Sequence, residues 1–378
     1  MSSTSRLPLF ALVLIALASC QERKHWIIES EIGRLRLEQI TDSVTMPFAM
    51  VFVSKNQILL GDRPLGVMYL VDTYNGGKTP VRGTPQVYGQ GDSGLLDIQL
   101  APDFEESHRI YFDYTLQDSS GFSLAVETAI LEEDSLLNRK RLFTARPYFP
   151  EQSFYGSRLL IDGEYVFITT GVDYTKQDSS QSLSNHLGKI MRIKTDGSIP
   201  QDNPFIGVPG ALPEIWCYGT RNPQGLALHP QTGEMWENEH GPKGGDEVNI
   251  IKKGLNYGWP VISHGIDYDD KPIGEGLREK EGMEQPMHFY VPSIAPSGLV
   301  FYTGDRYPEW KDNLFIGGMK LTHLNRLVLE GNKVVHEERI MTDLKWRVRN
   351  VVQGPDGYLY VTTDAGMEPG RVLRILPE

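Results

Sequence analysis

The chain is poor in cysteine, in net positive charge and in long apolar runs. Its 378 residues include two cysteines, and its formal net charge is −12. So acidic a protein has no general attraction to nucleic acid. The apolar run Leu9–Leu17 is too short to cross a bilayer. No long amphipathic helical pattern is present either, so the fold has to be built from other elements.

The N-terminus has the pattern of a bacterial lipoprotein signal peptide over residues 1–20. Arg6 supplies the positive charge, and the apolar run ends in Leu17-Ala-Ser-Cys20, which resembles a lipobox. We expect an exported protein, lipid-anchored through Cys20 and, because Gln21 follows, held at the outer membrane facing the periplasm. An ordinary cleaved signal is the alternative. Lipidation of Cys20 would leave Cys217 without a partner, as a buried structural thiol.

The rest of the chain is predicted to be all-β. Residues 21–44 are assigned to a linker and a first strand, and residues 45–378 to a single domain. A pattern of apolar strand, turn and second strand recurs six times, at Met50–Leu60, Ile98–Tyr114, Leu159–Thr170, Leu226–Trp236, Leu299–Ile316 and Val351–Thr363. Repeats of several strands at this spacing indicate a six-bladed β-propeller. A pair of β-sandwiches is the alternative architecture.

The stretch Tyr218–Pro260 carries the densest set of reactive residues. Arg221 and Asn222 lie in a turn rich in Gly and Pro, and Glu239–Glu247 holds three acids, a His, a Lys and three glycines. Glycine lets the backbone approach a ligand, and carboxylate and carbonyl oxygens are the ligands that Ca²⁺ requires. The spacing is not that of an EF-hand. A polar surface loop is the alternative interpretation.

Cationic residues recur near the C-terminus. Lys320 follows a predicted strand, and Arg347 and Arg349 alternate just before the last hairpin. Alternate residues of a strand point to one face, so two guanidiniums there suggest an anionic ligand. A solvated basic face is the alternative.

Several motifs together resemble one family over residues 44–376. They are Gly94–Phe104, Gly156-Ser-Arg-Leu159, Leu187–Ile193 with Asn203-Pro-Phe205, Arg221–Leu226, Glu239–Pro260, Ser293–Gly298 and Gly354–Tyr360. In this order they resemble the soluble quinoprotein glucose and aldose sugar dehydrogenases, also called glucose/sorbosone dehydrogenases. The resemblance implies a six-bladed propeller that binds pyrroloquinoline quinone (PQQ) and Ca²⁺. It also implies oxidation of an aldose at its anomeric carbon to a lactone.

The resemblance further implies roles for individual residues. Lys320, Arg347 and Arg349 would pair with the carboxylates of the quinone, Arg221 would lie by its oxygens, and Asn222 would hydrogen-bond it. The carbonyls of Gly241 and Pro242 would hold the Ca²⁺ that polarises the quinone. The positions matching a second, structural calcium region are Asp246, Glu247, Tyr257 and Asp267.

Two positions depart from the family pattern. Phe154 stands where the family has the His that removes the sugar proton, and phenylalanine accepts no proton. The cofactor-contacting Gln is displaced, so Gln90 or Asp92 takes its place. His240, and after it His264, are the alternative bases by proximity in sequence, although each is more simply a structural His.

Three classes of function stay open. The first is a quinoprotein sugar dehydrogenase, whose substrate is a small sugar and whose electron acceptor is unknown. The second is a non-enzymatic or carbohydrate-binding propeller that keeps the scaffold, which Phe154 favours. The third is a metal-dependent lactonase. The four cationic positions favour the first.

Overall fold

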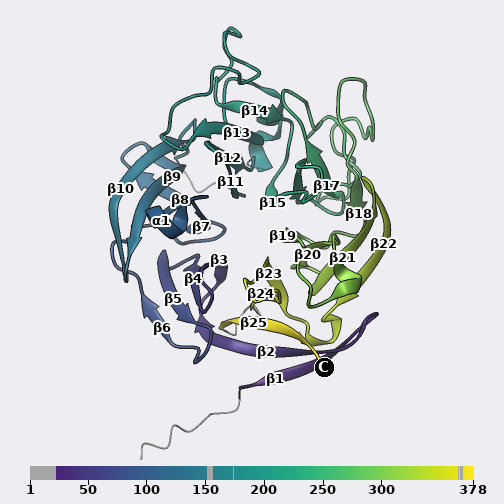
Figure 1. The fold of residues 1–378 in the computed structure, drawn as a ribbon. Coiled ribbons are helices and arrows are strands. Elements are labelled where there is room, and N and C mark those ends of the chain that lie inside the picture. Colours follow the sequence, from purple (N-terminus) through teal and green to yellow (C-terminus); the bar gives the residue numbers. More distant parts are fainter. Residues whose placement is uncertain (1–22, 151–155, 173, 365, 367–368) are drawn as a thin grey trace, which may run out of the picture.

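The six blades are the main feature of the molecule. The computed structural model describes residues 23–378 except 151–155, 173, 365 and 367–368. In this part of the chain the strands form six antiparallel sheets around a central axis, as Figure 1 shows. The predicted six-bladed propeller is confirmed, and the pair of sandwiches is wrong. Each of the six repeated hairpins falls on the two inner strands of one blade.

The first five blades are four-stranded sheets whose strands follow the chain outward from the axis. The first blade comprises β3 (Pro47–Ser54), β4 (Gln57–Asp62), β5 (Val67–Asp72) and β6 (Lys78–Pro80), and the second comprises β7 (Leu95–Leu100), β8 (Arg109–Asp118), β9 (Gly121–Glu132) and β10 (Ser135–Thr144). The third comprises β11 (Leu159–Asp162), β12 (Tyr165–Thr170), β13 (Lys189–Lys194) and β14 (Ile215–Tyr218), and the fourth comprises β15 (Pro223–Leu228), β16 (Met235–Glu239), β17 (Asp246–Ile251) and β18 (His288–Tyr290). The fifth comprises β19 (Pro296–Phe301), β20 (Leu314–Gly318), β21 (His323–Glu330) and β22 (Lys333–Ile340). Short helical turns lie in the connections, at α1 (Phe104–Ser107), η1 (Tyr174–Gln181), η2 (Pro308–Trp310) and η3 (Thr342–Leu344).

The sixth blade joins the two ends of the chain. Its strands, from the axis outward, are β23 (Arg347–Gln353), β24 (Leu359–Asp364), β25 (Gly370–Pro377), β2 (Gly33–Val44) and β1 (His25–Ser30). Strand β2 pairs with β25 along most of its length, with Leu37 opposite Ile375. Much of the segment 21–44, expected to hold a linker and one strand, therefore consists of two strands that close the ring (Figure 1).

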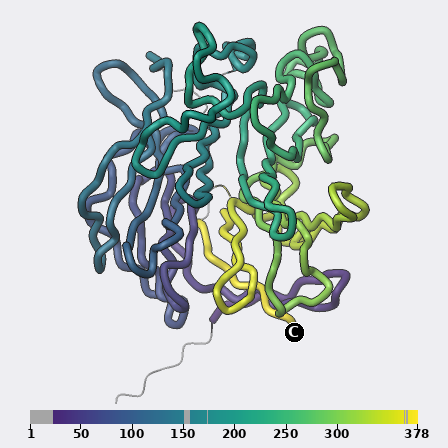
Figure 2. Tube along the Cα trace, turned by 45° about the horizontal axis from the view of Figure 1, so that its top comes forward, coloured from purple at the N-terminus to yellow at the C-terminus, as the bar shows by residue number. Residues whose placement is uncertain are grey.

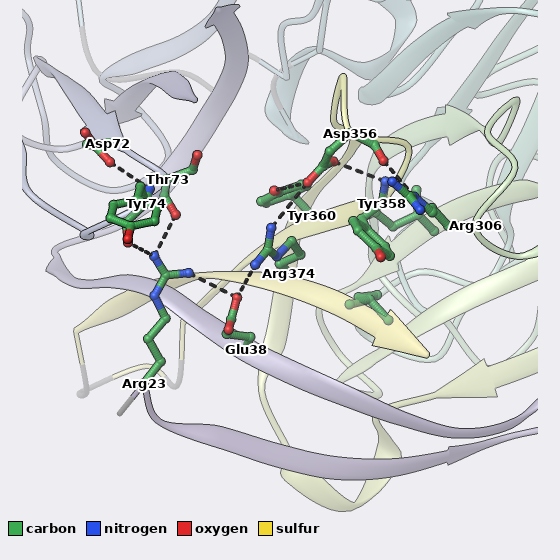
Figure 3. Close-up of polar contacts among 12 residues, drawn as sticks. Arg23, Glu38, Asp72, Thr73, Tyr74, Arg306, Asp356, Tyr358, Tyr360 and Arg374 are labelled. Atoms are coloured by element: carbon green, nitrogen blue, oxygen red, sulfur yellow. Dashed lines mark hydrogen bonds and ion pairs between the residues drawn. The ribbon is translucent and has the colours of Figure 1, made fainter. Parts of the chain in front are cut away.

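A network of charged side chains supports this closure (Figure 3). Glu38 of β2 accepts hydrogen bonds from Arg23 at 3.0 Å and from Arg374 of β25 at 2.5 Å. Arg23 also donates to the carbonyl of Thr73 in the first blade at 2.7 Å, and Arg374 pairs with Asp356 at 3.3 Å. The N-terminal segment is thus tied to the first and the last blade.

The hydrophobic core is divided among the gaps between blades. Six clusters of buried side chains each join two neighbouring blades, as Leu59 of the first blade and Ile110 of the second do. Because both faces of most sheets are covered, the inner strands read as nearly continuous apolar runs. Cys217 is fully buried in the cluster between the third and fourth blades and is not in a disulfide, as expected.

The two ends of the axis differ. At one end, the residues that begin the first strand of each blade meet the residues that follow its second strand. Phe48, Arg63 and His240 belong to this set. Thr73 follows the third strand of its blade, so Thr73 and Arg23 lie at the opposite end. In Figure 2 the long teal and green connections of the third and fourth blades extend at one end, and the N-terminal strands lie toward the other. No helix among the described residues is long and apolar enough to cross a membrane.

Candidate active site

A cavity of about 590 Å³ opens at the end of the axis where these loops converge. All six blades contribute to it, because strand ends from each blade meet at the axis. The lining residues are Phe48, Arg63, Asp92, Leu96, Gly156, Val172, Tyr174, Arg221, Asn222, Gln224, His240, Tyr268, Ala295, Met319, Arg347 and Arg349. The volume is within the range of pockets that hold small organic ligands.

Positive charge dominates the lining. Four of the lining residues are arginines, and only one, Asp92, is acidic. Asp92 lies 3.5 Å from Arg63, and Asp364 behind the wall pairs with Arg349. Burial, and then the nearby Arg349, lower the pKa of Arg63 from its ordinary value to about 10. The guanidiniums therefore repel one another when no ligand is bound. This repulsion suits the cavity to an anionic organic ligand.

The turn carrying Arg221 and Asn222 is held by a buried carboxylate. Glu239 at the end of β16 accepts the backbone N–H groups of both residues, the second at 3.0 Å. Arg221 donates from Nη1 to the carbonyl of His240 at 2.9 Å, and its guanidinium lies 5.1 Å from the ring centroid of Trp259. These contacts hold the guanidinium in place beside the cavity. A group that stabilises developing negative charge must be held in place in this way.

Gly156 permits the close approach of this turn. A Cβ at residue 156 would lie 2.0 Å from Oδ1 of Asn222 and 2.5 Å from Nε2 of Gln224. These distances are far below van der Waals contact, so only glycine fits. The Gly156-Ser-Arg motif of the sequence thus has a packing function at the cavity wall.

His240 lines the cavity in a defined tautomer. Its Nε2–H donates to the carbonyl of Pro296 at 2.7 Å, which leaves Nδ1 as the unprotonated nitrogen. Burial, and then Arg221, lower the pKa of His240 to about 3. The ring is therefore neutral, and a proton bound there is weakly held. His264, by contrast, is not a lining residue and stacks on Phe289 with ring centroids 4.0 Å apart.

The loop after His240 presents two carbonyl groups suited to a hard cation. The carbonyl oxygens of Gly241 and Pro242 accept no hydrogen bond from the described residues. The Asp246 carboxylate accepts the N–H of Gly241 at 2.9 Å and the N–H groups of Ile294 and Ala295 at 2.8 and 2.9 Å. Asp246 therefore shapes the loop, and the two carbonyls are the better candidates for Ca²⁺.

The other residues assigned to calcium do not form one group. The Tyr257 hydroxyl donates to the carbonyl of Ile250 at 2.7 Å, whereas Asp267 accepts from the Tyr174 hydroxyl at 3.1 Å at the cavity rim. Burial, and then Glu239, raise the pKa of Glu247 well above its usual range. Within the described ranges, no group of three or more His, Cys, Asp or Glu is arranged to hold a metal ion.

Four further expected positions lie outside this cavity or outside the described residues. Lys320 lines an adjoining cavity of about 470 Å³, which shares Ala295, Met319 and Arg347 with the first. Gln90 is not a lining residue and accepts from the Tyr88 hydroxyl at 3.2 Å, so Asp92 occupies the wall instead. Phe154 and Cys20 are not among the described residues.

Several lining residues were not predicted from the sequence. Phe48, Arg63, Met319, Tyr174 and Tyr268 come from four blades and share no motif. Arg63 directly follows β4, and the strand-end position was the one signal that could have identified it. The aromatic residues at the rim could be found only by bringing distant loops together.

Fold and cavity together define a six-bladed propeller with an arginine-lined cavity at one end of its axis. The family model described as glucose/sorbosone dehydrogenase matches residues 44–374, and the chain belongs to that family. It is 39% identical over 348 residues to aldose sugar dehydrogenase YliI of Escherichia coli, covering 91% of this chain and 93% of the relative. This relative and the family are both named sugar dehydrogenases, which places the protein among the oxidoreductases.

Solved structures agree with this assignment. The apo-form of the soluble aldose sugar dehydrogenase from Escherichia coli superposes with a TM-score of 0.86 at 38% identity, covering 91% of this chain and 100% of that chain. The PQQ-bound aldose sugar dehydrogenase from Streptomyces coelicolor superposes with a TM-score of 0.71 at 23% identity, covering 90% and 98%. The second likeness extends the shared fold to a more distant protein.

Proposed function

We propose that the protein oxidises aldoses at the anomeric carbon to lactones, with PQQ and Ca²⁺ as cofactors. When bound, the quinone supplies a two-electron acceptor and Ca²⁺ a Lewis acid. The observation that carries the proposal is the set of four cavity arginines facing one lining carboxylate. The quinone has three carboxylates, and guanidinium forks match carboxylates in charge and geometry.

The charged residues divide into two groups by position. Arg347 and Arg349 on β23 and Arg63 after β4 would hold the carboxylates, with Lys320 assisting from the adjoining cavity. Arg221 would face the end of the ligand where negative charge develops, because its guanidinium is fixed by the carbonyl of His240. Preorganised cations of this kind stabilise a transition state without reorganising.

Removal of the sugar proton is the step for which the site is least well equipped. Phe154 provides no proton acceptor. Of the residues proposed as bases, His240 lines the cavity, and its Nδ1 carries the lone pair that can accept a proton. A general base typically contributes about 10²–10⁴-fold to a rate. We therefore expect slow aldose oxidation by the native protein.

A titration tests the proposal directly. Purified protein loaded with Ca²⁺ is titrated with PQQ and followed by visible absorbance and by thermal melting, and dye-linked oxidation of several aldoses is then measured. A saturable spectral change at micromolar quinone with measurable turnover supports the proposal. The absence of any saturable change at these concentrations would rule it out.

Phe154 also favours a second candidate, a propeller that binds the cofactor or a sugar without turnover. The same experiment separates the two, because this candidate predicts no dye reduction with any aldose, whether or not the quinone binds. A metal-dependent lactonase fits the cationic lining less well, since that reaction needs a cluster of acids around the metal.

We further propose that Cys20 carries a lipid that holds the protein at the outer membrane, facing the periplasm. Only two residues separate Cys20 from Arg23, and Arg23 lies at the end of the axis opposite the cavity. The anchor would leave the cavity open to the periplasm and its soluble sugars. Metabolic labelling with palmitate should mark the wild type and not Cys20→Ala, and equal labelling of both would refute the anchor.

A further inference from the structure

Met319 lies in the wall between the two cavities. It lines both the cavity of about 590 Å³ and the adjoining one of about 470 Å³, and the residue is 6% exposed. Its backbone is fixed, because the N–H of Met319 donates to the carbonyl of Ala295 at 3.0 Å and the N–H of Lys320 donates to that of Ile294 at 2.8 Å. A small solute in either cavity can therefore reach a thioether that extends from a fixed backbone.

Two guanidiniums face the sulfur of Met319. Nη1 of Arg349 donates to Sδ at 3.0 Å, and Nη2 of Arg347 lies 3.9 Å from the same atom. A thioether is a weak hydrogen-bond acceptor. Nε of Arg347 is also buried and has no hydrogen-bond partner among the described residues. The two cations therefore have donor capacity that the sulfur does not satisfy.

From these contacts we propose that Met319 is a modification site, oxidised by hydrogen peroxide to methionine sulfoxide, and that the sulfoxide weakens cofactor binding. A lone pair of Sδ attacks one peroxide oxygen, and the S–O bond forms as the O–O bond breaks. The proton of the transferred oxygen moves to the departing oxygen, which leaves as water. The sulfur loses two electrons and the peroxide gains them, so no other reactant is needed. The modification stands by itself, whereas its effect on the cofactor rests on the proposed function.

The position of Met319 distinguishes it from methionines that are equally shielded. Met68 and Met191 are fully buried in clusters between blades. Met235 is 7% exposed, as little as Met319, but it packs in the cluster between the third and fourth blades and lines neither cavity. A peroxide molecule in a cavity therefore meets the sulfur of Met319 without any opening of the core.

Oxidation of Met319 would change the acceptor that the two arginines face. The added oxygen makes the side chain polar, and it accepts hydrogen bonds far better than the thioether does. Because nitrogens of both guanidiniums already lie within 3.9 Å of Sδ, an oxygen bonded to Sδ is within their hydrogen-bond reach. It would occupy N–H groups that the proposed function assigns to the carboxylates of the quinone. Loss of one hydrogen bond to a charged group weakens binding about 10- to 100-fold.

The first experiment locates the oxidation. The purified protein, without cofactor, is treated with hydrogen peroxide, and peptide mass spectrometry follows the gain of one oxygen atom at Met319 and at Met235. Met319 should be oxidised at least about tenfold faster, because the oxidant reaches it through the cavities. Saturating PQQ with Ca²⁺ should slow the reaction at Met319 and leave that at Met235 unchanged. Oxidation of Met319 no faster than that of Met235 would refute the modification site.

The second experiment measures the consequence for cofactor binding. Calcium-loaded protein is titrated with PQQ before and after peroxide treatment, and treatment should raise the Kd of the wild type about 10- to 100-fold. Met319→Leu, which lacks the sulfur, should have the same Kd before and after treatment, whereas the control Met235→Leu should respond as the wild type does. An oxidised wild type with unchanged Kd, or an equal loss of affinity in treated Met319→Leu, would refute the effect on the cofactor. If the untreated protein binds no quinone, the proposed function fails and this effect fails with it, while the relative oxidation rates still decide the modification site.

Discussion

Arg63→Met should change stability and cofactor affinity in opposite directions. Burial and Arg349 lower the pKa of Arg63 from its ordinary value to about 10, so at neutral pH the folded protein keeps a charge that it disfavours. Each pKa unit corresponds to about 1.4 kcal/mol, so the charge costs roughly 3 kcal/mol in the folded state without cofactor. Because the native pKa is the lower one, this cost is fully present at pH 7 and is relieved only above about pH 10.

The substitution also removes favourable contacts. Arg63 donates to the carbonyl of Gly91 at 3.0 Å, and its guanidinium lies 4.9 Å from the Phe48 ring centroid. Together these contribute about 1–2 kcal/mol. The partner Asp92 is largely exposed, so leaving it unpaired costs little. The unfolding free energy without cofactor should therefore rise by about 1–2 kcal/mol, as the difference of these contributions.

Affinity for the anionic cofactor should fall. Loss of one close charge pair in a partly desolvated site costs about 2–3 kcal/mol, or roughly 30- to 150-fold in Kd. Urea unfolding without cofactor and a quinone titration with Ca²⁺ give the two values. The control is Arg326→Met, a buried arginine paired with Glu338 outside the cavity, which should destabilise the fold and leave Kd unchanged. A destabilised Arg63 variant with unchanged quinone affinity would refute the reasoning.

The remaining predictions concern three other positions. Phe154→His should raise dye-linked aldose oxidation, up to about 10²–10⁴-fold if the imidazole is well oriented; strong native activity that the substitution leaves unchanged would identify another base, His240 first. Gly156→Ala should weaken quinone binding at least about tenfold, because the new Cβ would meet Asn222 Oδ1 at 2.0 Å, and unchanged binding would contradict the packing argument. Burial, and then Asp97, raise the pKa of Asp113 to about 8, so the native state holds an extra proton between about pH 4 and 8 and stability should fall as pH rises through that window. Asp113→Asn should flatten this dependence in urea unfolding, and an unchanged slope would count against it.

The propeller could be predicted because the sequence pattern of each blade's inner hairpin is local. Each inner hairpin, such as Val351–Thr363, carries its own apolar strands and turn residues within a dozen or so positions. The sequence predicts a linker and one strand over residues 21–44 where the structure has β1 and β2, because the partner of β2 lies at the other end of the chain, where Leu37 meets Ile375. No short-range pattern encodes such a pairing.

The cavity was predictable only in part, for the same reason. Arg221 was identified because it lies in a motif that resembles a family, and Arg347 and Arg349 because they alternate just before the last hairpin; the structure brings all three to one cavity. Arg63 and Tyr268 belong to no motif and become lining residues because six separate strand ends converge on the axis. Such convergence is a property of the closed ring and is absent from any single segment.

The identity of the bound cofactor is the central claim, and an absorbance titration with an arginine variant tests it most directly. Calcium-loaded wild type should give a saturable, equimolar spectral change with micromolar PQQ, and Arg221→Met should give a shifted spectrum with weaker binding, because its guanidinium lies at the cavity wall. No saturable change in the wild type, or identical spectra and affinities in both proteins, would contradict the account.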